Sequence, residues 1–218
     1  MQKLNEIERR VLGTLIEKWL TTPQGYPLSL NSLMNGCNQK SAREPLSEYT
    51  EQEIEQCCTA LKVKSFAIQF FGAGARVPKW EEALSAVLNL SKEESAVIAE
   101  LMLRGPQSEG ELRARASRMA EIPTLEVLHA TLEKLRTRPE PLVQRLSEEG
   151  RTRGVRWAHT FYAEGEALPA ESPTAFASGS FSASSAAAPG VNPLAALQSK
   201  VAELEARIIE LEKRTQGF

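Results

Sequence analysis

The stretch CNQKSAREPL, residues 37–46, concentrates hydrogen-bond donors between two apolar segments. Amide, hydroxyl, ammonium and guanidinium groups are the chemistry that contacts phosphate oxygens and groove edges in nucleic acids. The candidate nucleic-acid contacts in this part of the chain are Asn38, Gln39, Lys40, Ser41 and Arg43, with Arg76 and Lys79 on a predicted hairpin further along. The alternative is that the amides and the hydroxyl satisfy loop backbone while the cations are solvated.

A second set of cations follows in the other half of the chain. It comprises Arg113, Arg115 and Arg118 on or beside a predicted helix, and Arg151, Arg153 and Arg156 at the tip and in the second strand of a predicted hairpin. Arginines on a hairpin suit phosphate or minor-groove contacts. However, residues 90–165 hold twelve Lys and Arg against twelve Glu, so the arginines bind DNA only if the fold collects them on one side.

The residue types needed for catalysis are scarce. The 218-residue chain has no Asp and only His129 and His159, which lie far apart. Its three cysteines, Cys37, Cys57 and Cys58, lack CxxC spacing, which argues against a zinc site or a disulfide framework. We therefore predict a protein without enzymatic activity, metal or cofactor. The charged N-terminal segment fits neither a signal peptide nor a membrane span, which predicts a cytoplasmic protein.

The elements that must position these groups follow one pattern twice. Capping boxes at Asn5/Glu8 and Thr50/Glu53 begin the first and third helices of one copy, and SFAIQFFGAGARVPKW predicts a hairpin after them. Capping boxes at Ser91/Glu94 and Ser108/Glu111 begin two helices of the other copy, the latter predicted to run through Met119. A third helix from Thr124 and the strands PLVQRL and VRWAHTF complete it.

Three helices followed by a β-hairpin is the winged-helix arrangement. The predicted fold is therefore mainly α with small β-hairpins (α+β), with tandem winged-helix domains at residues 1–88 and 89–163. In such domains the third helix often enters the major groove. Here Glu48, Glu51, Glu53 and Glu55 crowd the start of that helix in the first domain, where phosphates would be repelled.

The motifs TTPQGYPLSLN and CNQKS, together with GAGARVPKW and LMLRGPQSEGELRARASRM, closely resemble the YceH family, bacterial proteins with tandem winged-helix domains. The resemblance covers about residues 1–162. It implies the fold and carries no established activity, so it assigns no catalytic or binding residue.

After Ala163 the composition changes. Residues 164–191 are rich in Ala, Ser, Pro and Gly without periodicity, which predicts a disordered linker, and residues 192–218 predict a coiled-coil helix. Its apolar positions alternate by three and four: Leu194, Leu197, Val201, Leu204, Ile208 and Leu211. Mostly β-branched a positions, leucine d positions and basic g positions facing acidic e positions favour a parallel homodimer. The alternative is a helix that folds back onto the domains.

Two classes of function remain open, and fold analogy favours the first. The first is a DNA-binding, transcription-regulatory dimer whose partner is double-stranded DNA. The second is a winged-helix scaffold for protein–protein interaction of the chromosome-organisation adaptor type, which the acidic third helix and the formal net charge of −2 suit. Affinity that falls steeply with salt would distinguish the first from the second.

Overall fold

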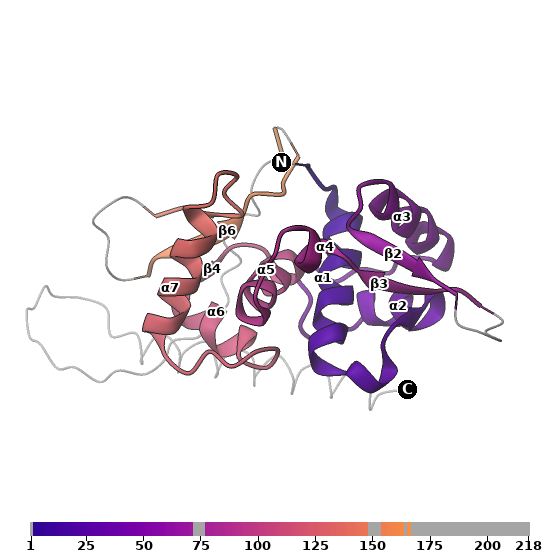
Figure 1. Cartoon of the computed structure of the whole chain (residues 1–218), viewed down its shortest axis with the longest axis horizontal. Helices are drawn as coiled ribbons and strands as arrows, with labels where there is room; N and C mark the ends of the chain where they lie inside the picture. Colours follow the sequence, from indigo (N-terminus) through magenta and orange to yellow (C-terminus); the bar gives the residue numbers. More distant parts are fainter. Residues whose placement is uncertain (1, 72–76, 148–153, 164, 167–218) are drawn as a thin grey trace, which may run out of the picture. The chain divides into compact units, whose positions relative to one another are not determined.

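The computed structural model describes residues 2–71, 77–147, 154–163 and 165–166 (Figure 1). These residues belong to one compact unit, Met1–Pro173. They form a mainly helical structure with small antiparallel sheets, which confirms the predicted α+β class. The predicted linker and C-terminal helix lie outside the described residues, except for the beginning of the linker.

The first repeat, residues 6–82, contains three helices and a three-stranded sheet among its described residues. The elements are α1 (Glu6–Thr21), the 3-10 turn η1 (Pro23–Gly25), β1 (Leu28–Ser29), α2 (Leu30–Cys37), α3 (Glu51–Val63), β2 (Ala67–Phe70) and β3 (Lys79–Glu82). The strands are antiparallel in the order β1-β3-β2. Trp80 of the central strand is buried and fixes the core face of the sheet.

The second repeat, residues 92–159, follows the short helix α4 (Leu84–Val87). It has the same order of helices and strands as the first repeat, without a counterpart of η1 among its described residues. The elements are α5 (Lys92–Arg104), β4 (Gln107–Ser108), α6 (Glu109–Ala116), α7 (Leu125–Arg136), β5 (Val143–Arg145) and β6 (Arg156–His159). The strand order is β4-β6-β5. Trp157 takes the place of Trp80, since each tryptophan is buried on the central strand and pairs with the short strand that precedes the second helix.

Capping explains why the helices begin where they do. The predicted capping boxes of α1, α3, α5 and α6 are present, because in each the cap side chain accepts the N3 amide and the N3 Glu accepts the cap amide. Ser29 and Thr124 cap α2 and α7 in the same way, without the reciprocal Glu. The prediction that the second helix of the second repeat continues through Met119 was wrong. Helix α6 ends at Ala116, because the amides of Arg118 and Met119 donate to the carbonyl oxygens three residues before them, those of Arg115 and Ala116, instead of four.

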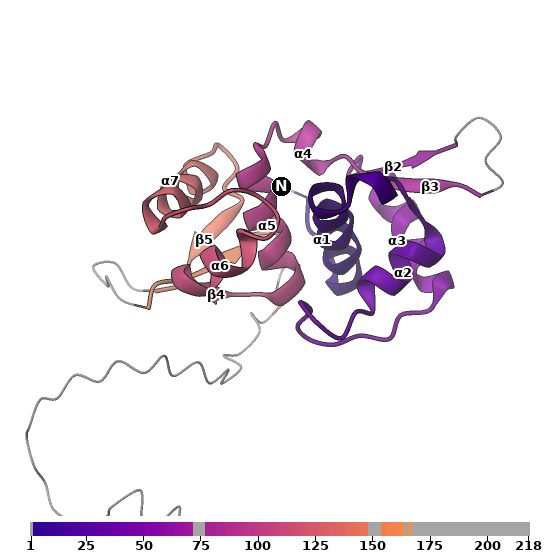
Figure 2. The same cartoon turned by 90° about the horizontal axis from the view of Figure 1, so that it is seen from below.

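The repeats join through their first helices. Helices α1 and α5 lie side by side (Figure 1 and Figure 2), and their apolar side chains merge into one core. Gly13 allows this approach, since a Cβ at this position would lie 3.1 Å from Leu103 Cγ and from Met102 Cβ. Any charged group on the facing sides of these helices must therefore find a partner inside the protein.

Candidate interaction surfaces

Arg43, a predicted phosphate contact, is buried. Its side chain is 0% exposed and donates from Nε and Nη2 to the carbonyl oxygen of Gly36, at 3.0 and 2.7 Å. Nη2 also pairs with Glu17 Oε2 of α1 at 2.5 Å. The guanidinium ties the connection between α2 and α3 back to the first helix, so in this conformation it cannot meet a phosphate.

Arg118 reaches the same carboxylate from the second repeat. Its Nη1 donates to Glu17, and its Nη2 lies 3.2 Å from Oε2 of the buried Glu100 on α5. Arg104 Nε lies 3.3 Å from the other Glu100 oxygen. These five residues, Glu17, Arg43, Glu100, Arg104 and Arg118, are called the Glu17 cluster below. They connect both repeats at the crossing of α1 and α5.

Two opposing effects set the protonation of Glu17. Burial by itself raises the pKa of the carboxyl group. The hydrogen bonds and charge of Arg43, followed by the charge of Arg118, outweigh burial and leave the Glu17 pKa below its usual range. At neutral pH the cluster therefore contains an ionised carboxylate held between two guanidinium groups.

The amides of the CNQKS stretch also have partners within the chain. Asn38 Nδ2 donates to Tyr49 O at 2.7 Å and its Oδ1 accepts the Tyr49 amide at 2.8 Å, which fixes the connection leading to α3. Gln39 Oε1 accepts from Lys18 Nζ at 2.9 Å and from Arg43 at 3.2 Å. Lys40 and Ser41 are exposed. Most of the donor chemistry in this stretch therefore holds the fold together.

Three of the remaining predicted contacts donate to groups within the chain, and two of them, Arg115 and Arg156, lie near each other beside Glu111. Arg113 Nη1 donates to Pro123 O at 3.0 Å, and Arg115 Nη1 donates to Gln107 Oε1 at 2.8 Å. Arg156 Nη2 donates to Pro106 O at 2.9 Å, and Lys79 is half-buried on β3. Other predicted sites lie outside the described residues: Arg76, Arg151 and Arg153, and the dimerisation positions Leu194, Leu197, Val201, Leu204, Ile208 and Leu211.

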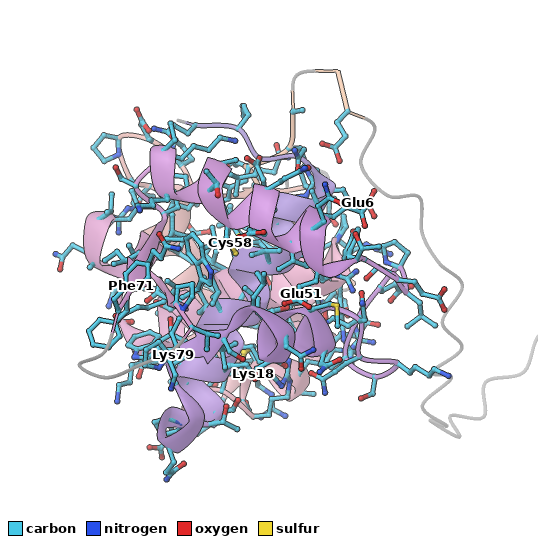
Figure 3. All side chains as sticks on the ribbon, turned by 90° about the vertical axis from the view of Figure 1, so that its right-hand side faces the viewer. Glu6, Lys18, Glu51, Cys58, Phe71 and Lys79 are labelled. Atoms are coloured by element: carbon cyan, nitrogen blue, oxygen red, sulfur yellow. The ribbon has the colours of Figure 1, made fainter. Side chains whose placement is uncertain are left out.

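The outward side of α3 is acidic and neutral rather than basic over most of its length. Its exposed residues before the last turn are Glu51, Gln52, Glu53, Glu55, Gln56 and Thr59. Glu53 also completes the α3 cap through Thr50. Figure 3 shows this face, with Glu51 toward one side and Phe71 and Lys79 of the hairpin toward the other. A DNA backbone approaching this helix would meet carboxylates first.

The first hairpin carries an exposed apolar surface that the sequence did not predict. Ile68 is 51% exposed, Phe70 45% and Phe71 67%, and Val63 and Val77 are exposed near them in the chain. Ile68 pairs with Glu81 and Phe70 with Lys79, so these four side chains share the sheet face opposite to Trp80. We call Ile68, Phe70 and Phe71 the wing patch.

The equivalent hairpin of the second repeat shows that the fold does not require this patch. Aligning Trp157 with Trp80 places Gln144 at the position of Ile68, and Leu146, 38% exposed, at that of Phe70. A period-two pattern in SFAIQFF predicts a strand, but it cannot say which face stays uncovered. Exposed neighbouring apolar side chains are typical of interaction sites.

The cysteines and the buried histidine have surroundings that suppress ionisation. Burial raises the pKa of the Cys37 thiol to about 11, and Cys57 and Cys58 are also buried. Burial, with the charge of Arg9, lowers the pKa of His159 to about 3, and its Nδ1 accepts the Phe161 amide at 3.2 Å. Within the described residues, no group of three or more His, Cys, Asp or Glu is arranged to hold a metal ion. The helices in the same part of the chain are too short or too polar to cross a membrane.

Comparison with known proteins shows that the family model and the individual relatives agree. Residues 4–152 match the family described as "Protein of unknown function, DUF480". A UPF0502 protein of Geotalea daltonii is 48% identical over 170 residues, which is 78% of each chain. The UPF0502 protein YceH of Salmonella paratyphi B is 38% identical over 222 residues, covering 99% of this chain and 96% of its own. The chain therefore belongs to the UPF0502 family, which includes the proteins named YceH.

Proposed function

We propose that this chain is a non-enzymatic adaptor built from two winged-helix domains, residues 1–88 and 89–163, and that it binds a protein through the wing patch of the first domain. The order of helices and strands in both repeats, and the position of the central strand in each sheet, support the winged-helix assignment. The function is then decided by the surface chemistry of the domains and not by their fold.

The wing patch is the observation that carries the proposal. Three large apolar side chains are about half exposed or more on one hairpin, in a chain whose other hairpin carries Gln144 at an equivalent position. Burying Ile68 and Phe70 against a partner would remove apolar area from water, the main driving force in protein association. Aromatic side chains are also frequent among the residues that dominate binding energy.

DNA binding, which fold analogy favours, has less support from the geometry than protein binding. Arg43 and Arg118 are engaged by Glu17, and Arg115 by Gln107 and Glu111. The outward side of α3 presents Glu51 and Glu55. Counterion release requires cations that can approach the phosphates, and each of these arginines would first have to leave its partner.

Site-specific photo-crosslinking in cells tests the proposal. A benzophenone amino acid replaces Phe71 in the full-length protein, and the same amino acid at the exposed Leu125 of α7 serves as the matched control. We expect crosslinked species at position 71 that survive nuclease and disappear with protease, and that weaken when Phe70→Ser is added. Products that nuclease removes, or equal crosslinking at both positions, would argue against a protein partner at the wing.

A DNA titration tests the DNA-binding alternative directly. Fluorescence anisotropy of random and genomic duplexes is measured with the full-length protein at two salt concentrations. The proposal predicts no salt-sensitive binding that depends on Arg113, Arg115 and Arg118. An affinity that falls steeply with salt and is lost in the triple alanine variant would instead establish the DNA-binding alternative.

A further inference from the structure

We infer that the partner segment is extended and adds to the edge of β2 as another strand, with apolar side chains on either side of an acidic residue. This inference rests on the proposed function and specifies its partner. In the sheet order β1-β3-β2, β2 is an edge, and β3 is its strand neighbour among the described residues. Edge strands are where extended peptides add to a sheet.

The register shows which backbone groups point away from β3. The Ala83 amide donates to Phe66 O at 2.9 Å, just beyond the pair formed by Ala67 and Glu82. Hydrogen-bonded pairs alternate along an antiparallel ladder, so Ile68 and Phe70 bond to β3 while the amide and carbonyl of Gln69 point outward. The Glu82 amide agrees with this phase, because it points to the β1 side and donates to Tyr26 Oη.

The side chains around Gln69 define the chemistry of the partner. A partner residue paired with Gln69 would place its side chain on the same sheet face as the Gln69 side chain. On that face, Lys62 Nζ lies 3.2 Å from Gln69 Oε1. A carboxylate there would reach the Lys62 ammonium. The residues before and after it would lie on the opposite face, beside Ile68 and Phe70. The fitting segment therefore alternates apolar, acidic and apolar residues.

The second repeat carries a different edge. At the positions of Ile68 and Gln69, β5 has Gln144 and Arg145. A charged or polar side chain on an edge strand is a common device against pairing with another chain. The first hairpin has apolar Ile68 and uncharged Gln69 at these positions, and this difference between repeats of one architecture assigns the docking edge to β2.

Peptide binding to the full-length protein tests the inference. The probe is fluorescein-labelled Ser-Thr-Val-Glu-Val-Thr-Ser, measured by fluorescence anisotropy at protein concentrations up to about 1 mM. One comparison peptide has Lys in place of Glu, and another has the two valines adjacent. We expect the alternating acidic peptide to bind about tenfold more tightly than either comparison, because only it matches both Lys62 and the spacing of Ile68 and Phe70.

Variants of the protein distinguish strand pairing from non-specific binding to exposed apolar side chains. Phe70→Thr keeps a β-forming residue and removes the aromatic contact. Gln69→Pro removes an amide that β3 does not use, as prolines on edge strands do. We expect each to weaken binding about tenfold, whereas Leu146→Thr on the second hairpin leaves it unchanged. Circular dichroism and thermal melting verify that each variant is folded.

Several results would overturn the inference. These are absence of binding over the whole concentration range, equal affinity for the three peptides, or unchanged affinity in folded Phe70→Thr and Gln69→Pro. If protein crosslinks at position 71 persist in any of these cases, the adaptor function stands and the strand-addition mode fails. If the crosslinks are absent as well, both proposals fail.

Discussion

Arg43 and Arg118 both contact Glu17, although they lie 26 and 101 positions from it in the sequence. The carboxylate is nearly fully buried between them, so its charge is balanced by two groups that belong to different repeats. Buried ion pairs are costly to break, since removal of one partner leaves the other charge buried and uncompensated. Glu17 is therefore the residue at which an electrostatic change affects both repeats together.

Glu17→Gln tests this at neutral pH. We expect the free energy of unfolding to fall by about 3 kcal/mol, because the buried Arg43 guanidinium loses its counter-charge. Urea denaturation followed by circular dichroism measures it. Glu48→Gln, at an exposed position, is the control and should change stability by less than about 0.5 kcal/mol. Equal stability of Glu17→Gln and the natural chain would contradict the role of the cluster.

The same variant has a defined pH dependence. Folding lowers the pKa of Glu17. The contribution of its ionised carboxylate to the free energy of unfolding is therefore complete above the ordinary pKa of 4.5 and is lost as pH falls through the folded pKa. The difference between the natural chain and Glu17→Gln should therefore be constant from pH 7 to about 5 and shrink below that. A difference that grows as pH falls would show that the carboxyl is protonated in the folded protein.

His159 acts in a different pH window. Burial, aided by Arg9, lowers its pKa from 6.5 to about 3, so the unfolded chain binds a proton that the folded chain does not. Its stabilising effect is complete above pH 6.5 and is lost as pH falls toward 3. Between pH 7 and pH 5 we expect this residue to account for a loss of about 2 kcal/mol. His159→Asn, which keeps an acceptor for the Phe161 amide, should remove most of that slope in urea titrations, and an unchanged slope would refute the assignment.

At the scale of elements, helix starts were predictable and helix partners were not. A cap and its N3 glutamate are three residues apart, so the sequence of α1, α3, α5 or α6 contains all the information that begins the helix. The end of α6 was less visible in the sequence, since Arg118, Met119 and Ala120, which follow Ser117, all have good helix propensity. The contact between α1 and α5 depends on Gly13, whose importance appears only when Leu103 is seen against it.

Two glycine substitutions test the helix crossing. Gly13→Val should lower the free energy of unfolding by about 2 kcal/mol, because its side chain would overlap Met102 and Leu103. Gly110→Ala is the matched control in α6, where a Cβ meets no atom of the described structure within 4 Å. It should raise stability by about 0.5–1 kcal/mol through the lower entropy of the unfolded chain. Thermal melts of both variants measure the effects, and a neutral Gly13→Val would mean that the helices can move apart without cost.

At the scale of the whole molecule, the compact unit would hold its two proposed winged-helix domains as one body, since a continuous core and the Glu17 cluster join them. Docking at β2 would then fix the second domain relative to the partner. The C-terminal heptads predict in addition that two such bodies associate, which would double the number of wing patches and increase avidity.

The parallel coiled-coil dimer stays a prediction of the sequence. Ile208→Lys places a charge at an a position and should reduce the mass measured by light scattering from that of a dimer to that of one chain. Ala206→Lys, at the outward f position of the preceding heptad, is the control and should leave the dimer intact. A natural chain that is monomeric, or an Ile208→Lys variant that remains dimeric, would reject this mode of association.

By itself, the sequence determined the local structure: the helix caps, the hairpins, the repeated order of elements and the α+β class, because capping and periodicity act between residues a few positions apart. It also determined the scarcity of catalytic residue types. The tertiary structure alone decided what the polar residues do. Glu17 meets Arg43 and Arg118 through chain folding, so that these two predicted nucleic-acid contacts form ion pairs within the chain. The tertiary structure also leaves Ile68 and Phe70 uncovered. Their exposure depends on which surfaces pack together and not on the order of residues in the strand.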